Sequence, residues 1–207
     1  MNVDITLPDG SVRNYESPVT GYQIAESIGP RLLKDAICVE IDNKFQDLSF
    51  EISENINLRI VTTKDLDALH ILRHSSAHIL AQAVLNLYPN AQFGVGPSIE
   101  NGFYYDFLFE TPIKENELEE IEKEMKRIAK SSQSFIKSEI TKKDAVKIFK
   151  NQKLKLELIE SAESDEGVGE EIVSTYANDG FIDLCMGPHV PSTSVLKYFK
   201  LTKVSGA

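Results

Sequence analysis

The start of the chain alternates apolar and polar residues with a period of two. Residues 3–7 read Val-Asp-Ile-Thr-Leu, and residues 8–10 read Pro-Asp-Gly before a second short alternating run at 12–15. Alternation places one side of each segment against a core, and Pro-Asp-Gly is typical of a tight turn. The pattern therefore predicts a β-hairpin.

A short helix and further strands follow the hairpin. Thr20 can cap a helix that runs to about residue 28, where Gly29-Pro30 ends it. Apolar runs at 38–41 and 58–61, the first followed by a polar turn, predict two more strands. Hairpin, helix and strands in about sixty residues predict a small ubiquitin-like β-grasp domain at 1–62, and the absence of His from it suggests a binding or positioning module.

The rest of the chain, 63–207, changes to helical periodicity with a β region inside it, so the whole chain is predicted to be α+β. The apolar spacing predicts helices at 65–87, 115–130 and 142–150, a β region at 90–109 with a hairpin turn at 100–102, a loop at 163–170, and strands at 181–184 and 198–204.

Composition limits the class of protein. The 207 residues are 42% hydrophobic and 26% charged, as in an ordinary globular protein. No apolar run is long enough for a membrane span, and the N-terminus has no signal or transit pattern, so we expect a cytoplasmic protein without membrane partners. With only two cysteines, a disulfide framework is excluded.

The charge is unevenly distributed. A net charge of −10 argues against a protein that coats nucleic acid non-specifically. Residues 123–155 nevertheless hold eleven Lys or Arg and three acids, and residues 156–183 hold nine acids and no Lys or Arg. This pattern fits either a solvated helix face followed by an acidic loop, or a phosphate-facing strip that ends at an acidic site.

The candidate chemistry lies in two close pairs. His74 and His78 are four residues apart and therefore share one helix face, and Cys185 and His189 form a second pair with the same spacing. Imidazole and thiolate groups act as nucleophiles, metal ligands and proton carriers near neutral pH. The pairs predict a four-residue pocket, the alternative being a half-buried His pair and a packed cysteine. His70, one turn earlier, fits a surface or packing residue.

Spacing alone leaves the kind of site open. Three His and one Cys could hold tetrahedral Zn²⁺, either as a closed structural site or as a hydrolytic site with one water. Without metal, the same side chains could position a water, and Cys185 could act as a covalent nucleophile, although nothing marks an oxyanion hole. Ser75 stands where a zincin protease needs Glu, which excludes that class.

Two charged residues fall where they could join the pocket. Asp183 precedes Cys185 by two positions and would point the same way on a strand. Lys155 alternates with Leu154 and Leu156, which predicts the edge of a strand. A solvated face is the alternative for both. The segment 94–97, Gly-Val-Gly-Pro, lacks the third glycine of a dinucleotide loop.

Three motifs together resemble the editing domain of bacterial-type threonyl-tRNA synthetases. They are R-H-S-S-A-H at 73–78, N-G-F-Y-Y-D at 101–106 and D-L-C-M-G-P-H-V-P at 183–191. Residues 1–62 look like the small TGS domain that begins these enzymes, which makes 63–207 the editing domain. The two His and Cys pairs alone are less specific, because alanyl-tRNA synthetase editing domains and free-standing alanyl-tRNA deacylases share them.

The resemblance implies hydrolysis of seryl-tRNA(Thr) to serine and tRNA(Thr). Serine lacks one methyl of threonine, and such a contact discriminates by only about 1–3 kcal/mol, so a second pocket is needed for fidelity. The family continues into a class II core and an anticodon-binding domain that are absent here. ATP, threonine attachment and the zinc of that core are therefore not expected of this chain. We expect the chain to be monomeric and a full-length parent to be homodimeric.

The resemblance also assigns roles to residues. His74 and Lys155 would hold or activate the attacking water, Asp183 would bind the seryl ammonium or hydroxyls, and Cys185 would shape and polarise the pocket. The residues expected to orient or line the substrate are His78, His189 and Tyr104. The partner is the acceptor end of tRNA(Thr) carrying serine, and the family's editing pocket works without metal.

Two other hypotheses stay open. One is a zinc-dependent deacylase of the alanyl-tRNA type. The other is a non-catalytic tRNA-binding module with structural zinc. In both, the ligands would be His74, His78, Cys185 and His189.

Overall fold

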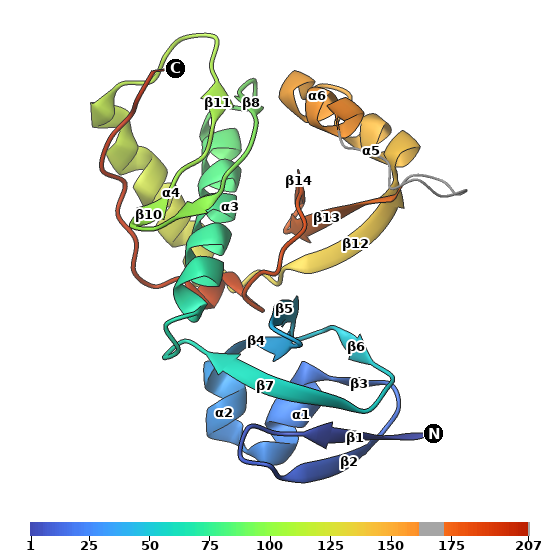
Figure 1. The fold of residues 1–207 in the computed structure, drawn as a ribbon. Helices are drawn as coiled ribbons and strands as arrows, with labels where there is room; N and C mark the ends of the chain where they lie inside the picture. The colour runs from blue at the N-terminus through green and yellow to red at the C-terminus, as the bar shows by residue number, and fades with distance from the viewer. Residues whose placement is uncertain (162–171, 207) are drawn as a thin grey trace. The chain divides into compact units, whose positions relative to one another are not determined.

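The computed structural model describes residues 1–161 and 172–206, which form two compact units (Figure 1). The first unit contains Met1–Leu72 and the short segment Gly187–Pro191, and the second contains Arg73–Met186 and the residues from Ser192 onward. The loop predicted at 163–170 lies outside the described residues. Among the described residues, no helix combines the length and apolar character needed to cross a membrane.

The first unit is a five-stranded mixed sheet with two short helices. Its elements are β1 (Asn2–Thr6), β2 (Val12–Glu16), β3 (Val19–Thr20), α1 (Gly21–Ile28), α2 (Pro30–Asp35), β4 (Ala36–Ile41), β5 (Lys44–Asp47), β6 (Glu51–Ile52) and β7 (Ile56–Thr62). The sheet order is β2-β1-β7-β4-β5, with β1 parallel to β7 and the other pairs antiparallel. This arrangement confirms the predicted hairpin and β-grasp fold.

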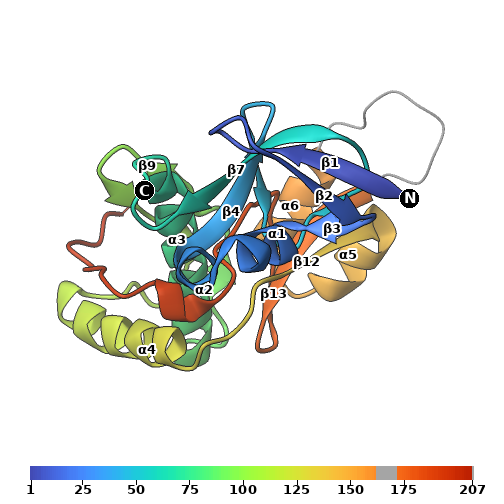
Figure 2. The same ribbon diagram turned by 90° about the horizontal axis from the view of Figure 1, so that it is seen from below.

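Local signals and apolar burial explain the first unit. Thr20 and Gln23 form a capping box, in which the Thr20 N–H donates to Gln23 Oε1 at 2.8 Å and the Gln23 N–H donates back to Thr20 Oγ1. The helix ends at Ile28 as predicted, but Pro30 then begins a second helix, because proline suits the first helical position. Ile24 of α1 packs into an all-apolar core with the strands, and Figure 2 shows α1 and α2 beside the sheet.

The second unit combines helices with short antiparallel strands. Its elements are α3 (Ala68–Leu87, of which the part from Arg73 belongs here), β8 (Gln92–Phe93), β9 (Ser98–Ile99), β10 (Gly102–Phe103), β11 (Phe107–Leu108), the 3₁₀ turn η1 (Glu115–Glu117), α4 (Leu118–Lys130), β12 (Ile136–Thr141), α5 (Lys142–Ile148), α6 (Lys153–Ser161), β13 (Ile172–Asn178), β14 (Phe181–Leu184) and the 3₁₀ turn η2 (Thr193–Val195). The predicted helices, the strand at 181–184 and the hairpin turn before Gly102 are confirmed.

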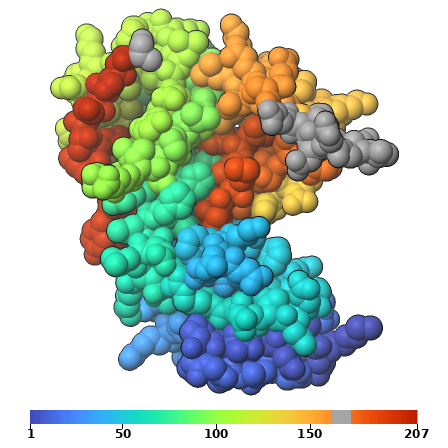
Figure 3. Space-filling model, viewed as in Figure 1, coloured from blue at the N-terminus to red at the C-terminus, as the bar shows by residue number. Residues whose placement is uncertain are grey.

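An antiparallel sheet in the order β12-β13-β14 organises one half of this unit. Its apolar side packs on α5 and α6 through Phe149, Ile159 and Phe181, and the space-filling view shows these orange and red segments in contact (Figure 3). In the other half, α4 lies beside α3 in both ribbon views, and Asn86 of α3 donates to Glu124 of α4 at 2.6 Å.

The strand predicted around Lys155 is wrong, because this segment is α6. Alternation of Lys and Leu fits a strand edge, but over nine residues the burial follows a helix: Lys155 and Ile159, four residues apart, are the buried positions. The N–H groups of Lys155 and Leu156 both donate to the Gln152 carbonyl at 3.0 Å, as in a helical first turn.

The strand predicted at 198–204 is also wrong, since the described residues there form no strand. Tyr198 is almost fully exposed, so its aromatic side chain has no sheet face to cover. The Leu201 N–H donates to the Glu122 carboxylate at 3.0 Å instead of to a neighbouring strand. A side chain of α4 thus replaces the backbone ladder that the alternation suggested.

Candidate active site

Asp183 is the centre of a buried polar cluster in the second unit. It lies on β14, and its carboxylate meets three side chains from different elements. Oδ1 is 2.5 Å from Lys155 Nζ, while Oδ2 accepts a hydrogen bond from Tyr105 at 2.6 Å and lies 3.0 Å from His78 Nε2. Asp183, Lys155 and His78 are each 3% exposed or less.

The surroundings keep Asp183 ionised. Burial by itself would raise its pKa, but the hydrogen bond from His78 and the charges of His78 and Lys155 outweigh it and lower the pKa to about 2. Burial, together with the charge of Asp183, holds the pKa of Tyr105 well above its usual value. Tyr105 therefore stays protonated and able to donate to the carboxylate.

Lys155 reaches this carboxylate from α6. Its ammonium donates to the Gly94 carbonyl at 2.5 Å and to the Tyr105 hydroxyl at 3.1 Å, in addition to Asp183. It also lies over the Phe93 ring, 4.8 Å from the centroid. An ammonium has three protons, so these three acceptors use all of them.

His78 lies on α3 between aromatic rings. Its imidazole is stacked on Phe135 at 5.7 Å between centroids and meets Phe181 edge-on at 5.3 Å. One turn earlier on the same helix face, the His74 ring is nearly parallel to that of His78, 6.5 Å away. The predicted shared helix face is thus confirmed.

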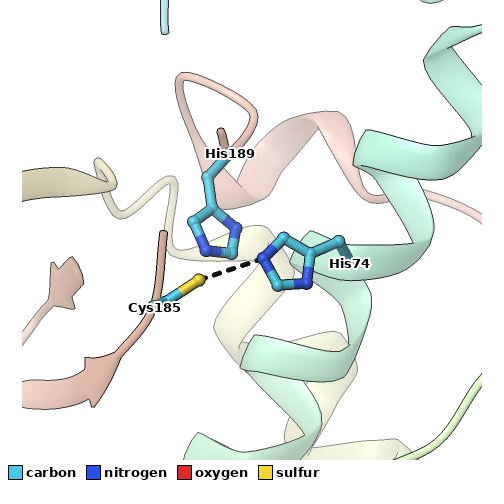
Figure 4. Close-up of side chains that lie close together, drawn as sticks. All are labelled: His74, Cys185 and His189. Carbon is cyan, nitrogen blue, oxygen red and sulfur yellow. Dashed lines mark hydrogen bonds between the residues drawn. The ribbon is translucent and has the colours of Figure 1, made fainter. Parts of the chain in front are cut away.

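His74 in turn meets Cys185, which follows β14. His74 Nε2 and Cys185 Sγ are 3.0 Å apart and joined by a hydrogen bond (Figure 4), and both residues are partly exposed. Two hydrogen bonds hold Cys185 against β13: its N–H donates to the Ser174 carbonyl, and the Ser174 hydroxyl donates to the Cys185 carbonyl.

Imidazole and thiolate are good zinc ligands, so the donor chemistry of His74 and Cys185 fits this metal. Figure 4 shows these two side chains facing each other, which makes them a candidate ligand pair. His78 is outside this pair and bonds Asp183 instead. If zinc were bound, it would supply a Lewis acid or an activated water.

The remaining expected residues have different surroundings. His189 is buried in the segment Gly187–Pro191 of the first unit, where its N–H donates to Asp47 Oδ1 at 3.0 Å. His70 is exposed, which agrees with a surface residue. Tyr104 is 44% exposed.

Sequence reasoning missed Tyr105, the neighbour of Tyr104. The alternation in this segment carried the signal, because Phe103, Tyr105 and Phe107 share one side and are the more buried positions. The sequence also did not indicate the structural role of the glycine segment 94–97. Gly94 supplies the carbonyl for Lys155, and any Cβ on Gly96 would overlap the Tyr105 ring.

The basic stretch 123–155 fits the predicted solvated helix face along α4, and its end is buried, while the phosphate-facing strip stays a prediction. Lys126 and Arg127 pair with acids of the same helix, Glu122 and Glu124, at 2.6 and 2.7 Å, as on a solvated helix face. Its last residue, Lys155, turns inward to Asp183. Only this end of the stretch enters the cluster.

The site can therefore do two things. Its inner part, Asp183 with Lys155, Tyr105 and His78, holds a fixed charge pair away from water. Its outer part, His74 with Cys185, offers an imidazole and a thiol that a ligand can reach. Such an arrangement is suited to binding a polar group and moving a proton.

Two family models match the chain. The TGS domain matches residues 3–62, and the threonyl and alanyl tRNA synthetase second additional domain matches residues 173–207, which include β14, Asp183 and Cys185.

Curated relatives match over almost the whole chain. Threonine–tRNA ligases of Ralstonia nicotianae and Francisella philomiragia are 48% identical to it, and that of Paraburkholderia phytofirmans is 49% identical, each over 99% of this chain. The alignment covers 32% of each relative, so the chain spans about a third of their length. The chain, with a TGS domain at its start and a threonyl and alanyl tRNA synthetase second additional domain at its end, is thus homologous over its whole length to the N-terminal region of threonine–tRNA ligases.

Proposed function

We propose that the second unit hydrolyses the ester that joins serine to the 3′-terminal adenosine of mischarged tRNA(Thr). The observation that carries this proposal is the buried Lys155–Asp183 pair with His78 beside it, next to the accessible His74–Cys185 pair. The homology to the N-terminal region of threonine–tRNA ligases supports the choice of substrate.

The buried Lys155–Asp183 pair is better explained by a role in catalysis than by a contribution to stability. Removing two charges from water costs more than packing apolar side chains of the same size would, so a buried ion pair is weak evidence for stability. Strongly perturbed groups clustered beside an accessible imidazole and thiol are instead typical of functional sites. A purely structural role for the Lys155–Asp183 pair would not explain why the chain accepts this desolvation cost.

The contacts suggest how the roles divide. Lys155 has no proton left for water, so its role is to hold Asp183 in place and ionised. Asp183 orients His78 and keeps acceptor capacity for a substrate ammonium or hydroxyl. His74, with Cys185 against it, is the group that holds the attacking water.

In this reaction the water oxygen attacks the ester carbonyl carbon, and the bond from that carbon to the ribose oxygen breaks. His74 takes one water proton and passes it to the departing ribose oxygen, which leaves as a hydroxyl, while the other water proton stays with the carboxyl group of serine. The products are serine and tRNA with a free 3′ end. We further propose that the chain acts as the editing part of a threonine–tRNA ligase, whose other parts attach threonine to tRNA(Thr) with ATP.

Discrimination would come from size. A pocket that accepts serine and has no room for the extra methyl of threonine rejects the correct product, whereas a synthetic site that binds the shared hydroxyl gains only about 1–3 kcal/mol from that methyl.

The test is deacylation of seryl-tRNA(Thr) and threonyl-tRNA(Thr) under single-turnover conditions, with protein in excess so that weak tRNA binding does not hide hydrolysis. We expect release of serine, retention of threonine, and a loss of about 10²-fold or more in His74→Ala, the range of a general base. His70→Ala is the matched control, since this exposed histidine lies one turn earlier on α3. Failure to release serine, or equal loss in both variants, would overturn the proposal.

A second candidate is a zinc-dependent deacylase of the alanyl-tRNA type, favoured by the 3.0 Å contact between two good zinc ligands, His74 and Cys185. Metal analysis of protein purified without chelator separates the two candidates. About one zinc per chain, lost in Cys185→Ala, supports the zinc enzyme, whereas hydrolysis by metal-free protein supports the metal-free site.

A further inference from the structure

One face of α3 meets the β13–β14 hairpin at three successive helical turns. His74, His78 and Gln82 are spaced by four residues and therefore lie above one another on the helix. His74 contacts Cys185, His78 contacts Asp183, and Gln82 contacts Asn178. The first two contacts belong to the proposed active site, and the third does not.

The third contact is part of a buried cluster of three side-chain amides, Gln82, Gln133 and Asn178, which we call the amide cluster. Asn178 Nδ2 donates to Gln82 Oε1 at 2.6 Å and to Gln133 Oε1 at 3.0 Å, and Gln82 Nε2 donates to Gln133 Oε1 at 3.0 Å. All three residues are at most 9% exposed. These bonds satisfy polar groups that would be costly to bury alone, and among the described residues Asn178 Oδ1 is the one oxygen of the cluster that they leave without a partner.

The amide cluster lies at the turn of the hairpin. Asn178 is the last residue of β13 and pairs with Phe181 of β14, so the cluster fixes the turn. Asp183 lies further along β14, and Cys185 directly follows that strand. Gln133 is itself anchored, because its N–H donates to Thr193 Oγ1 at 3.0 Å and its carbonyl accepts from the Thr193 N–H at 2.8 Å.

Hydrogen bonds between amides are directional, so they specify one position of the hairpin along α3, whereas apolar side chains would tolerate sliding. We propose that the amide cluster is a positioning device that sets the hairpin against α3, so that His78 meets Asp183 and His74 meets Cys185. Its catalytic consequence rests on the proposed function, but its geometric consequence does not.

The test compares Gln82→Leu and Asn178→Leu with two control variants. Asn86→Leu lies one turn further on α3 and bonds Glu124 of α4 instead of the hairpin. Ile121→Ala removes a buried side chain of α4 and controls for a general loss of stability. Should Gln82→Leu not fold, Gln82→Met keeps the length of the side chain without its amide.

Two readouts are measured on the folded proteins. The first is kcat and KM for seryl-tRNA(Thr) hydrolysis. The second is the rate at which iodoacetamide alkylates Cys185 at one fixed pH, with the modified residue identified by mass spectrometry. Cys38 does not interfere, because burial raises the pKa of its thiol to about 12.

We expect each amide-cluster variant to lower kcat about tenfold, equivalent to about 1.4 kcal/mol, with little change in KM. We also expect a severalfold change in the Cys185 alkylation rate, with both controls near wild type. Equal effects in Ile121→Ala, or an unchanged alkylation rate in the amide-cluster variants, would overturn the proposal. Should the wild type release no serine, the proposed function fails, and the alkylation rate alone decides on the positioning role.

Discussion

The two units of this chain place their charges in opposite ways. In the first unit the buried core is apolar, and its largest ion-pair cluster surrounds Arg59, whose side chain is 30% exposed. In the second unit Lys155, Asp183 and His78 are almost completely buried. Charge at a surface costs little and contributes little, whereas buried charge must be matched by close partners.

The comparison shows which unit depends on a buried charge pair. Arg59 bonds Glu40, Asp65 and Asp67 at 2.6–3.5 Å, but water screens these pairs. These pairs therefore contribute little to the stability of the first unit. In the second, the shared carboxylate of Asp183 is both a structural requirement and the proposed basis of its chemistry.

Of the variants considered, Asp183→Ala should have the largest effect on the stability of the second unit. It leaves the Lys155 ammonium buried without its carboxylate, which should destabilise the second unit by about 3–5 kcal/mol. Hydrogen exchange measured by mass spectrometry reports each unit separately. Peptides of the second unit should exchange faster, and those of the β-grasp sheet should be unchanged.

Arg59→Ala is the matched control for this prediction. Because its pairs are partly exposed, its loss should cost at most about 1 kcal/mol. Equal destabilisation of the two units by these two variants would contradict the contrast between surface and buried charge.

Acid should affect the second unit through the same carboxylate. The pKa of Asp183 is about 2 in the folded chain, below its value of about 3.9 when unfolded. The resulting stability, about 2–3 kcal/mol, is fully present above about pH 4 and is lost as the pH falls through 2. Denaturant unfolding between pH 5 and pH 2 measures it, and Asp183→Asn should remove this part of the pH dependence. An identical acid slope in the variant would show that other carboxylates are responsible.

Gly96→Ala should give a smaller effect than Asp183→Ala and tests the position of Tyr105. A Cβ at this position overlaps the Tyr105 ring, so the ring must move away from Asp183, at about 1–3 kcal/mol. Gly102→Ala is the control, because a Cβ there meets nothing within 4 Å. Thermal unfolding compares the two variants. A Gly96→Ala protein as stable as Gly102→Ala would show that Tyr105 does not need its present position.

Local patterns in the sequence were sufficient to predict several features of the structure. The first hairpin, the Thr20 cap and the shared face of His74 and His78 each depend on residues a few positions apart, where turn chemistry and helical periodicity act directly. The motif at 183–191 also predicted that Asp183 and Cys185 belong to the candidate site.

Tertiary structure decided the rest, for reasons that lie outside any short window. Lys155 is helical because its ammonium and Ile159 must enter the same core, although its neighbours alternate like a strand. Tyr105 bonds Asp183 across 78 residues of chain, and Gln82 joins Asn178 across 96. Periodicity specifies which side of an element is buried, but only packing between distant elements determines which partner that side meets.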